Sequence, residues 1–510
     1  MNLTKEDIAF IKNYGLTLEK VYHQLESFSL GIPYIDIVTA ASIGNGIEII
    51  STENQRMLID FYEAKKDNLE IVKFVPASGA ATRMFKFLFE FLDDYNPNEI
   101  DLSKYIKEGN LEMLSKFVLA IKEFAFLNTV RKKIRENHPN FKHGTKGERA
   151  QIFVKTLLSE KGLNYGNLPK GLILFHKYSK YATTAFEEQL YESAFYASVN
   201  NNVYLHFTFS KKHVPFFKEE FEAVKNRVSK KTKTEFHISY SFQKKETDTL
   251  AVNKDLSLFR DAKNNPVLRP SGHGALIENL NEVNADVIFI KNIDNVVVEE
   301  YVEEIAYYKK LLAGKLLWLQ EKVFAYIKEV LTEGVSAEKF NEIKSFLWNE
   351  LNIKNLPNEA KLIIEILNKP LRVCGVVKNT GAPGGGPFWV KNEKEEITLQ
   401  IVEMSQINPN NESHQLMVKE ATHFNPVDIV CGIRDYKGEK FDLTKFIDPK
   451  SGIITKKSQD GKPLKALELP GLWNGAMAGW NSVFIEVPLQ TFNPVKTVND
   501  LLNKEHRPNI

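Results

Sequence analysis

The chain has 510 residues, of which 43% are hydrophobic and 26% are charged, and its formal net charge is +2. These values are ordinary for a globular protein, and the near-neutral charge gives no reason to expect nucleic acid or a membrane surface as a partner. With Cys374 and Cys431 as its two cysteines, the chain is not a disulfide-dense scaffold, and neither cysteine has metal-ligand spacing. Without a signal-peptide pattern or an apolar window of about 18 residues, a cytoplasmic protein is predicted.

Hydrophobic periodicity predicts a helical N-terminal extension over residues 1–68, then a strand and a second helical region. Thr4 followed by Asp7 is a helix-start pattern, in which each side chain caps the other residue's backbone N–H. The apolar run at 71–75 predicts a buried strand that leads into a loop of small residues at 76–83. Residues 84–160 return to a helical pattern.

From about residue 169 to 295, short β-rich runs alternate with helical ones. The runs at 203–209 and 235–242 have strand composition, and a helix between them is expected to begin near Val214 and Pro215. This alternation is typical of βαβ units and a mainly parallel sheet. Residues 298–368 are again helical in pattern, and a second β-rich block begins at Leu371.

The predicted fold class is therefore α/β, with a Rossmann-like mixed but mainly parallel sheet. The predicted boundaries are 1–68 for the helical extension, 69–432 for the α/β domain and 433–510 for a mixed C-terminal segment that packs on the core. Two helical insertions are expected in the α/β domain, at about 87–165 and 298–368.

The loop at 76–83 has the chemistry of a phosphate-binding turn. A loop of small residues between a strand and a helix directs backbone N–H groups and the helix N-terminus toward an anion. Arg83 adds a guanidinium fork for phosphate oxygens. An ordinary turn would explain the same residues without a ligand.

A second segment with chemical content is Gly272-His273-Gly274, because glycines without Cβ atoms let the backbone approach a planar ligand. Shortly afterwards the apolar run at 287–290 leads to Asp294. A carboxylate at the carboxyl end of a buried strand lies where open α/β sheets bind ligands and metals. A tight turn and a capped strand end are the alternative explanation.

Together, these segments resemble the uracil-binding loop and the magnesium-binding aspartate of UDP-sugar pyrophosphorylases. The family's loop, Leu-x-Gly-Gly-x-Gly-Thr-Arg-Leu, is matched at Gly79, Thr82 and Arg83, whereas Ser78 and Ala81 replace glycines. If those positions need a positive φ, the replacement strains the backbone by about 1 kcal/mol or more. If glycine only gives clearance there, a methyl group crowds the triphosphate.

The resemblance covers residues 70–90, 165–296 and 370–432, and it implies a glycosyltransferase-A (GT-A) type fold in a bacterial domain-of-unknown-function branch of this family. It implies that Ser78, Gly79 and Thr82 bind the nucleotide and that Asp294 holds Mg²⁺. It assigns the base to the four residues Gln243, Gly272, His273 and Gly274.

In the family, Pro-Lys-Gly follows the phosphate loop closely. Here Pro169-Lys170-Gly171 follows after about eighty mostly helical residues. Lys170 is therefore the candidate for the phosphate-neutralising lysine, displaced in sequence by an insertion. A surface lysine in a turn is the alternative, and Lys86 is a second candidate for the role.

The second β-rich block resembles the sugar-binding part of UDP-N-acetylglucosamine pyrophosphorylases. The resemblance implies that Gly384, Gly385 and Glu403 line the sugar pocket and that Lys378 meets a phosphate. A carboxylate such as Glu403 can accept hydrogen bonds from vicinal hydroxyls. The resemblance further implies that His423 and Asn425 contact the sugar and that Asp428 completes a magnesium site.

The implied reaction joins UTP and a sugar 1-phosphate into a UDP-sugar and pyrophosphate, with Mg²⁺ as cofactor. The attacking phosphate oxygen is already ionised, so Arg83, Lys170 and Lys378 are expected to neutralise charge and not to act as bases. Two alternatives stay open: a catalytically inactive sugar-nucleotide-binding protein and a glycosyltransferase, which would normally need a second metal-binding carboxylate. The sugar, the base and the oligomeric state are not determined by the sequence.

Overall fold

The computed structural model describes residues 3–77, 79, 81–332, 335–381, 384–392, 395–424, 428–459 and 461–508. The chain forms two compact units, each assembled from separate stretches of sequence. The first unit contains Met1–Phe74, Ser241–Ile290 and Tyr308–Leu489. The second unit contains Val75–Tyr240, Lys291–Tyr307 and Gln490–Ile510.

The main sheet of the first unit is mixed and mainly parallel, as predicted. Its strands lie in the order β2 (Ser42–Ile43), β3 (Gly46–Glu48), β18 (Asn481–Glu486), β12 (Leu371–Val376), β15 (Asp428–Gly432), β11 (Val287–Ile290) and β4 (Ile71–Pro76). Of these, β15 runs antiparallel to both neighbours, and the other pairings are parallel. The middle strands β12, β15 and β11 are buried along their whole length, which explains their mainly apolar sequences, and they also bury Arg372 on β12 and Asp428 on β15.

Two smaller antiparallel sheets complete the first unit and carry several predicted site residues. One consists of β1 (Asp36–Ala40), β13 (Gly385–Lys391) and β14 (Ile397–Glu403). The other has the order β10 (Leu268–Arg269), β9 (Thr249–Val252), β17 (Lys462–Glu468) and β16 (Ile453–Gln459). The second of these sheets pairs strands from distant parts of the sequence, and β10 leads directly into the Gly-His-Gly segment.

The helices of the first unit agree with the sequence pattern, except near the N-terminus. They are α1 (Lys5–Tyr14), α2 (Leu18–Leu30), α3 (Thr52–Lys65), α11 (Ile277–Leu280), α13 (Ala337–Asn349), α14 (Ala360–Leu367), α15 (Glu412–Glu420) and most of α12 (Val302–Thr332). The predicted capping pair is confirmed, because Thr4 Oγ1 accepts from the Asp7 N–H at 3.1 Å. Residues 36–48 form strands β1 to β3 instead of helix, because they pair with strands from the far end of the chain.

The second unit contains the predicted strand–helix–strand segment. Strand β7 (Asn202–Thr208) is followed by α10 (Val214–Thr232) and then β8 (Glu235–Ser241), and Pro215 lies in the first turn of the helix as expected. A short hairpin of β5 (Leu174–Lys177) and β6 (Ala182–Thr184) precedes helix α9 (Ala185–Ser193).

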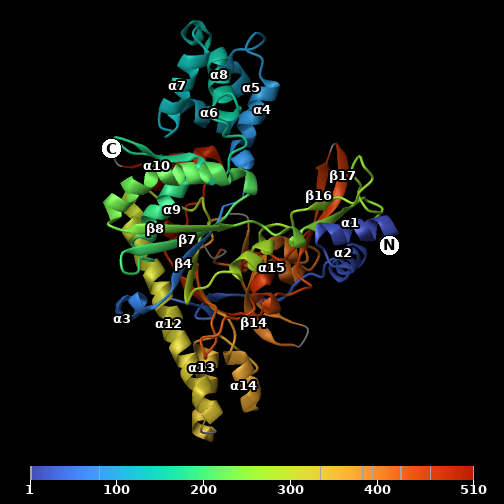
Figure 1. Ribbon diagram of the computed structural model, residues 1–510, viewed down its shortest axis with the longest axis vertical. Coiled ribbons are helices and arrows are strands. Elements are labelled where there is room, and N and C mark those ends of the chain that lie inside the picture. Colours follow the sequence, from blue (N-terminus) through green and yellow to red (C-terminus); the bar gives the residue numbers. More distant parts are fainter. Residues whose placement is uncertain are drawn as a thin grey trace. The chain divides into compact units, whose positions relative to one another are not determined.

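The first predicted insertion is a group of helices, drawn from blue to cyan in Figure 1. It consists of α4 (Lys86–Asp94), α5 (Leu102–Glu108), α6 (Glu112–Leu119), α7 (Leu127–Asn137) and α8 (Lys146–Leu158). Aromatic rings fill its centre, including Phe91 stacked on Tyr95 and Phe124 stacked on Phe126. The same cluster includes Phe175, Val296 and Val495, so these helices pack on the rest of the second unit through a shared core.

Within the described ranges, none of the helices is both long and apolar enough to cross a membrane.

Candidate functional site

The two glycines of the Gly-His-Gly turn are required for different reasons. Gly272 has φ 88°, a backbone conformation that L-residues rarely adopt. At Gly274 a Cβ atom would lie 1.8 Å from the carbonyl oxygen of Pro470, so the close approach of two backbone segments excludes a side chain. The turn is fixed further by Leu469, whose N–H donates to the Ser271 carbonyl at 2.9 Å.

The imidazole of His273 is oriented by a C-terminal segment about 200 residues further along the chain. The Leu472 N–H donates to His273 Nδ1 at 3.1 Å, and the Trp473 ring packs on the imidazole with centroids 4.8 Å apart. An Nδ1 that accepts a hydrogen bond leaves the proton of the neutral imidazole on Nε2. Desolvation lowers the pKa of His273 although 42% of the side chain is exposed, and the Leu472 contact favours the same neutral form.

The residues predicted to bind the base and those predicted to bind the sugar lie next to each other in the first unit. His273 Nε2 is 4.0 Å from Glu403 Oε1. Glu403 ends strand β14 and pairs in register with Gly385 on β13, and the Gly384 carbonyl accepts from the Met404 N–H at 3.3 Å. Two motifs separated by about 130 residues therefore meet at one place.

The ionised form of Glu403 is disfavoured in its surroundings. Desolvation raises the pKa of Glu403, and the carboxylate of Glu468 raises it further. Glu468 itself is paired with Lys457 at 2.7 Å and accepts from Thr455 Oγ1 at 3.3 Å. The Glu403 side chain is 30% exposed, and it also accepts from the backbone N–H of Gln406 in the turn that follows β14.

Buried polar groups without hydrogen-bond partners among the described residues occur around this turn. They are Nε2 of Gln243, Oγ of Ser271 and both amide atoms of Asn474. The Gln243 segment is tied to the turn through Asn279, whose amide donates to Ser241 Oγ and to the Phe242 carbonyl, both at 2.8 Å. Each such group costs about 1–3 kcal/mol when left unpaired, so a ligand or water that satisfies them would be favoured.

A second group of predicted residues adjoins strand β13. A Cβ atom at Gly386 would lie 2.9 Å from the His423 carbonyl, so strand β13 approaches this backbone closely. His423 Nε2 lies 3.3 Å from Glu486 Oε1, and Lys378 Nζ is 3.9 Å from the same oxygen. The side chain of Lys378 is 73% exposed. Glu486 was not predicted as a site residue, because its local sequence contains no recognisable motif.

Asp428 lies in a different environment from the one predicted for a metal ligand. It forms an ion pair with Lys309 of helix α12, and neither side chain is more than 1% exposed. An ion that bound Asp428 would have to displace this buried ammonium group. Asn425 and Ser78, two further predicted site residues, lie outside the described residues.

In the second unit the loop at 76–83, predicted to bind phosphate, lies next to the segment that leads into Pro169-Lys170-Gly171. The Ala81 N–H donates to the Leu168 carbonyl at 3.0 Å, and Thr82 Oγ1 donates to the Gly166 carbonyl at 3.3 Å. The helical segment between these residues therefore begins and ends at the same place in the unit. Arg83 is exposed, and no carboxylate in the described part of the chain pairs with it.

Ala81 does not carry the strain considered from the sequence. It is not among the positive-φ residues, and it begins a short 3₁₀ helix, Ala81–Phe85. Its methyl group is fully buried in the aromatic core of the insertion. Alanine at this position is therefore explained by packing.

Lys170 and Asp294 form an ion pair, with Nζ 2.6 Å from Oδ2, and Lys170 also donates to the Val495 carbonyl at 2.5 Å. The side chains are 19% and 15% exposed. Gly171 permits this arrangement, because a Cβ atom there would lie 2.9 Å from the Phe217 ring and 3.1 Å from Ile293. The pair unites two residues that were predicted separately.

Helix α9 holds the turn that carries Asp294. Gln189 Nε2 donates to the carbonyls of Asn292 and Ile293, at 2.9 and 3.2 Å, and Lys291 forms a buried ion pair with Glu192 at 2.8 Å. These contacts fix the backbone on both sides of the strand end.

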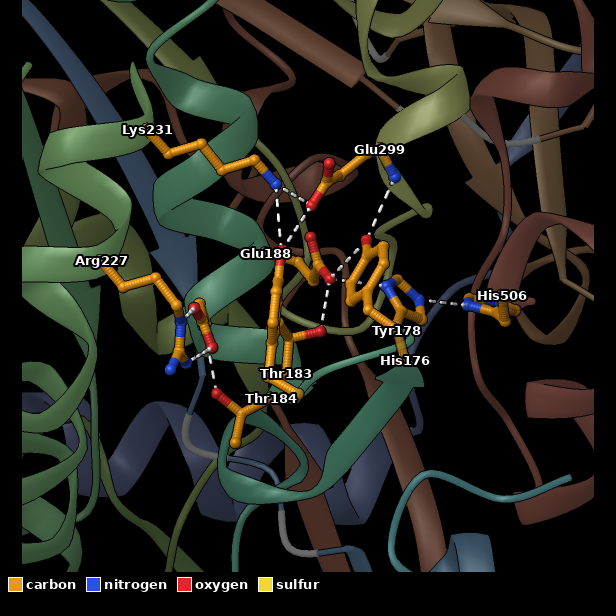
Figure 2. Close-up of polar contacts among 11 residues, drawn as sticks. His176, Tyr178, Thr183, Thr184, Glu188, Arg227, Lys231, Glu299 and His506 are labelled. Carbon is orange, nitrogen blue, oxygen red and sulfur yellow. Dashed lines mark hydrogen bonds and ion pairs between the residues drawn. The ribbon is translucent and has the colours of Figure 1, made fainter. Parts of the chain in front are cut away.

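The same helix is anchored by the polar network shown in Figure 2. Glu188 Oε1 accepts from His176 Nδ1, Tyr178 and Thr183 at 2.8, 3.1 and 2.5 Å. His176 Nε2 lies 3.0 Å from Nδ1 of His506, which belongs to the C-terminal segment. Burial lowers the pKa of His506 to about 3, and the neighbouring His176 adds to the effect.

No group of three or more His, Cys, Asp or Glu side chains suited to a metal ion occurs among the residues that the structure describes. Asp294 offers one carboxylate. Mg²⁺ commonly binds proteins through one or two carboxylates, while substrate phosphates and water complete its shell. The donor set at Asp294 thus suits a Mg²⁺ ion that arrives with a nucleotide.

Comparison with solved structures finds distant similarity along nearly the whole chain. A mutant UDP-glucose pyrophosphorylase from Leishmania major in complex with UDP-glucose is 13% identical, with a TM-score of 0.44 and coverage of 100% of this chain and 80% of that chain. The uridine diphosphate N-acetylglucosamine pyrophosphorylase from Trypanosoma brucei in complex with inhibitor is 10% identical, with a TM-score of 0.47 and coverage of 98% and 79%. UDP-glucose phosphorylase from Trypanosoma brucei is 12% identical, with a TM-score of 0.44 and coverage of 98% and 80%.

No curated protein matches the chain. A family match extends over residues 4–507, nearly the whole sequence, and so the chain belongs to the family described as Domain of unknown function (DUF4301).

Proposed function

We propose that the chain is a nucleotidyltransferase, which forms a nucleoside-diphosphate sugar and pyrophosphate from a nucleoside triphosphate and a sugar 1-phosphate. UTP is the proposed nucleotide. The observation that carries the proposal is the 4.0 Å approach of His273 Nε2 to Glu403 Oε1, with Gly385 opposite Glu403. A nucleoside-diphosphate sugar carries its base and its sugar at the two ends of one molecule, and the residues predicted for both lie in one compact unit.

The first unit supplies groups for recognition. The Nε2–H of neutral His273 and the unpaired Gln243 amide nitrogen are hydrogen-bond donors, which match the carbonyl oxygens of a pyrimidine base. The backbone at Gly272 and Gly274 can approach the plane of the base. Glu403 would accept from sugar hydroxyls, and those bonds would offset the desolvation of its carboxylate.

Arg83 and Lys170 are the proposed cations for the phosphates. The attacking oxygen of a sugar 1-phosphate is ionised at neutral pH, so the reaction needs alignment and neutralisation of charge and no general base. Arg83 is exposed and free of a carboxylate partner among the described residues, and Lys170 is held rigidly by Asp294 and Val495. Lys378, in the first unit, is a further candidate cation.

Mg²⁺ is part of the proposal, with Asp294 as the protein ligand. A bound Mg²⁺ would neutralise and orient phosphate oxygens. When phosphates approach, the ammonium group of Lys170 can transfer its contact from Asp294 to a phosphate oxygen, which frees the carboxylate. The ion pair thus keeps both groups in place and charge-balanced before the nucleotide binds.

One observation favours a second candidate, a sugar-nucleotide-binding protein without transfer activity. Lys170 already contacts Asp294 and the Val495 carbonyl, so its charge is balanced without a metal or phosphate. A chain that only binds would keep the recognition residues of the first unit and use Lys170 as a structural group.

The experiment that tests the proposal measures pyrophosphate release by the purified full-length chain. The reactions contain Mg²⁺, each of the four nucleoside triphosphates and a panel of sugar 1-phosphates. Release that requires one nucleotide and one sugar 1-phosphate is the expected result. Absence of release across the panel, together with calorimetric binding of a UDP-sugar, would replace the transferase with the binding protein.

A further inference from the structure

A cavity of about 290 Å³ lies between helix α10 and strand β8 in the second unit. Its lining includes five aromatic side chains, which are Phe186, Phe209, Phe217, Phe221 and Tyr240. None of its lining residues belongs to the groups proposed above to bind nucleotide, sugar or metal. The cavity therefore requires a separate explanation.

The sequence of α10 explains why the cavity is apolar with a charged margin. Residues at spacings i, i+3, i+4, i+7 and i+8 share one face of a helix, and this face carries Val214, Phe217, Lys218, Phe221 and Glu222. On β8, Ile238 and Tyr240 point to the same side because alternate residues of a strand share a face. The two faces meet but do not fill the space.

The cavity has a rigid aromatic floor. Phe186, Phe209 and Phe217 are at most 2% exposed, and the rings of Phe209 and Phe217 stack with centroids 3.8 Å apart and planes 10° apart. Val214, Phe221, Ile238 and Tyr240 are only half-buried and form its sides. An apolar ligand would bury apolar surface against both the floor and the sides, and each Å² buried contributes about 25 cal/mol to the free energy of binding.

The volume indicates the size of a suitable ligand. An apolar protein cavity of about 150 Å³ stays dry and takes one benzene ring. The cavity here is about twice that volume, so it has space for two fused rings. Flat aromatic rings would stack on the aromatic floor with favourable geometry.

The charged margin is asymmetric and favours an anion. Glu222 is neutralised by Lys225, with Nζ 2.5 Å from Oε2. Lys218 has its ammonium group 5.4 Å from the centre of the Tyr240 ring, and within the described part of the chain no carboxylate pairs with it. A cation without a counter-charge at the margin of an apolar cavity is complementary to a ligand with an apolar body and one negative group.

We propose that this cavity binds a small two-ring aromatic carboxylate, with its rings on the floor formed by Phe209 and Phe217 and its carboxylate at Lys218. The inference does not rest on the proposed transferase activity. It assigns the second unit a binding site for a ligand that is chemically unrelated to nucleotides and sugars.

The test uses the full-length protein and 1-naphthoate as the probe, with binding measured by isothermal titration calorimetry. The uncharged analogue 1-naphthalenemethanol has the same rings and lacks the carboxylate. Three variants separate the contributions. Lys218→Met removes the charge, Ile238→Trp fills the cavity, and Lys230→Met is a matched control for an exposed lysine elsewhere on α10.

Saturable binding of one 1-naphthoate per chain is expected, about tenfold weaker in Lys218→Met, as the loss of one charge-assisted contact implies. The affinity for 1-naphthalenemethanol should not change in that variant. Lys230→Met should bind both compounds like the original protein, and Ile238→Trp should bind neither. Absence of saturable binding, or unchanged binding to Ile238→Trp, would overturn the site. Equal affinity for the two compounds would overturn the carboxylate assignment and leave the cavity to neutral aromatic molecules.

Discussion

The ammonium group of Lys170 lies 2.6 Å from Oδ2 of Asp294, although the two residues are 124 positions apart in the chain. One was predicted to neutralise phosphate and the other to hold a metal. Their pairing means that neither group is exposed as an isolated charge, and that each depends on the other for its position. Variants of this pair therefore give the most direct test of the proposed chemistry.

Replacing Asp294 by Asn should reduce pyrophosphate release at least about 100-fold, because a preorganised charge at the phosphates contributes on that scale. Lys170→Met should have a comparable effect on release. Because the two side chains are only 19% and 15% exposed, removal of one charge leaves the other without its partner, so both variants should also unfold at a lower temperature, and release is compared below that transition. Lys104→Met, on the insertion and paired with Glu108, serves as the matched control. Full activity in Asp294→Asn would remove this residue from the mechanism.

Mg²⁺ alone should not bind the protein measurably. Asp294 is a single carboxylate and is already neutralised by Lys170, so the free energy of metal binding must come largely from phosphates. Titration calorimetry should show no saturable heat with Mg²⁺ alone, and a Mg²⁺-dependent affinity for UTP. Tight binding of Mg²⁺ to the nucleotide-free protein would contradict this view of the site.

Gly272→Ala should weaken UTP binding, because a side chain at φ 88° strains the turn by about 1 kcal/mol or more. Gly438 provides a matched control, since its φ is 83° and a Cβ atom there would meet nothing within 4 Å. Both variants should lose similar stability in urea unfolding, whereas only Gly272→Ala should lose affinity in calorimetry. Equal loss of affinity in both variants would show that the effect is not local to the turn.

Glu403→Gln should raise the KM for the sugar 1-phosphate about tenfold and leave the KM for UTP nearly unchanged. A neutral amide accepts hydrogen bonds from hydroxyls less strongly than a carboxylate. Stability should be equal or higher, because the substitution removes a desolvated charge that Glu468 repels. Glu396→Gln, in an exposed hairpin, is the control. A marked loss of stability in Glu403→Gln would indicate a structural role instead.

The His506 site predicts a loss of stability at acid pH. Burial lowers the pKa of His506 to about 3 in the folded chain, whereas an unfolded histidine titrates near 6.5. Between these pH values the histidine of the unfolded chain binds a proton that the folded chain does not bind. The contribution of His506 to the free energy of unfolding is therefore complete above pH 6.5 and is lost as pH falls. The slope is at most about 1.4 kcal/mol per pH unit.

Urea unfolding between pH 5.0 and 7.5 should therefore show a shallower pH dependence for His506→Gln than for the original protein. His143→Gln, at an exposed position, should keep the original slope. If the slopes of all three proteins coincide, His506 does not control acid stability.

Much of the fold was predictable from local pattern. The apolar run at 287–290, the Thr4–Asp7 capping pair and the start of α10 at Val214 depend on neighbouring residues, and each is confirmed by the structure. Strands β1 to β3 were not predicted, because β1 pairs with β13 and β3 pairs with β18, in each case more than 300 residues away, and β2 pairs with β3. Local hydrophobic periodicity does not indicate which distant strands pair.

The candidate site divides in the same way. Residue types and their spacing were enough to recognise the Gly-His-Gly turn, the Pro-Lys-Gly segment, and the carboxylates Asp294 and Glu403. Three relationships are visible only in the folded chain: the Leu472 N–H donates to His273 Nδ1, Lys170 pairs with Asp294, and Lys309 forms a buried ion pair with Asp428. These relationships depend on distance and desolvation, which arise only when segments far apart in the chain pack together.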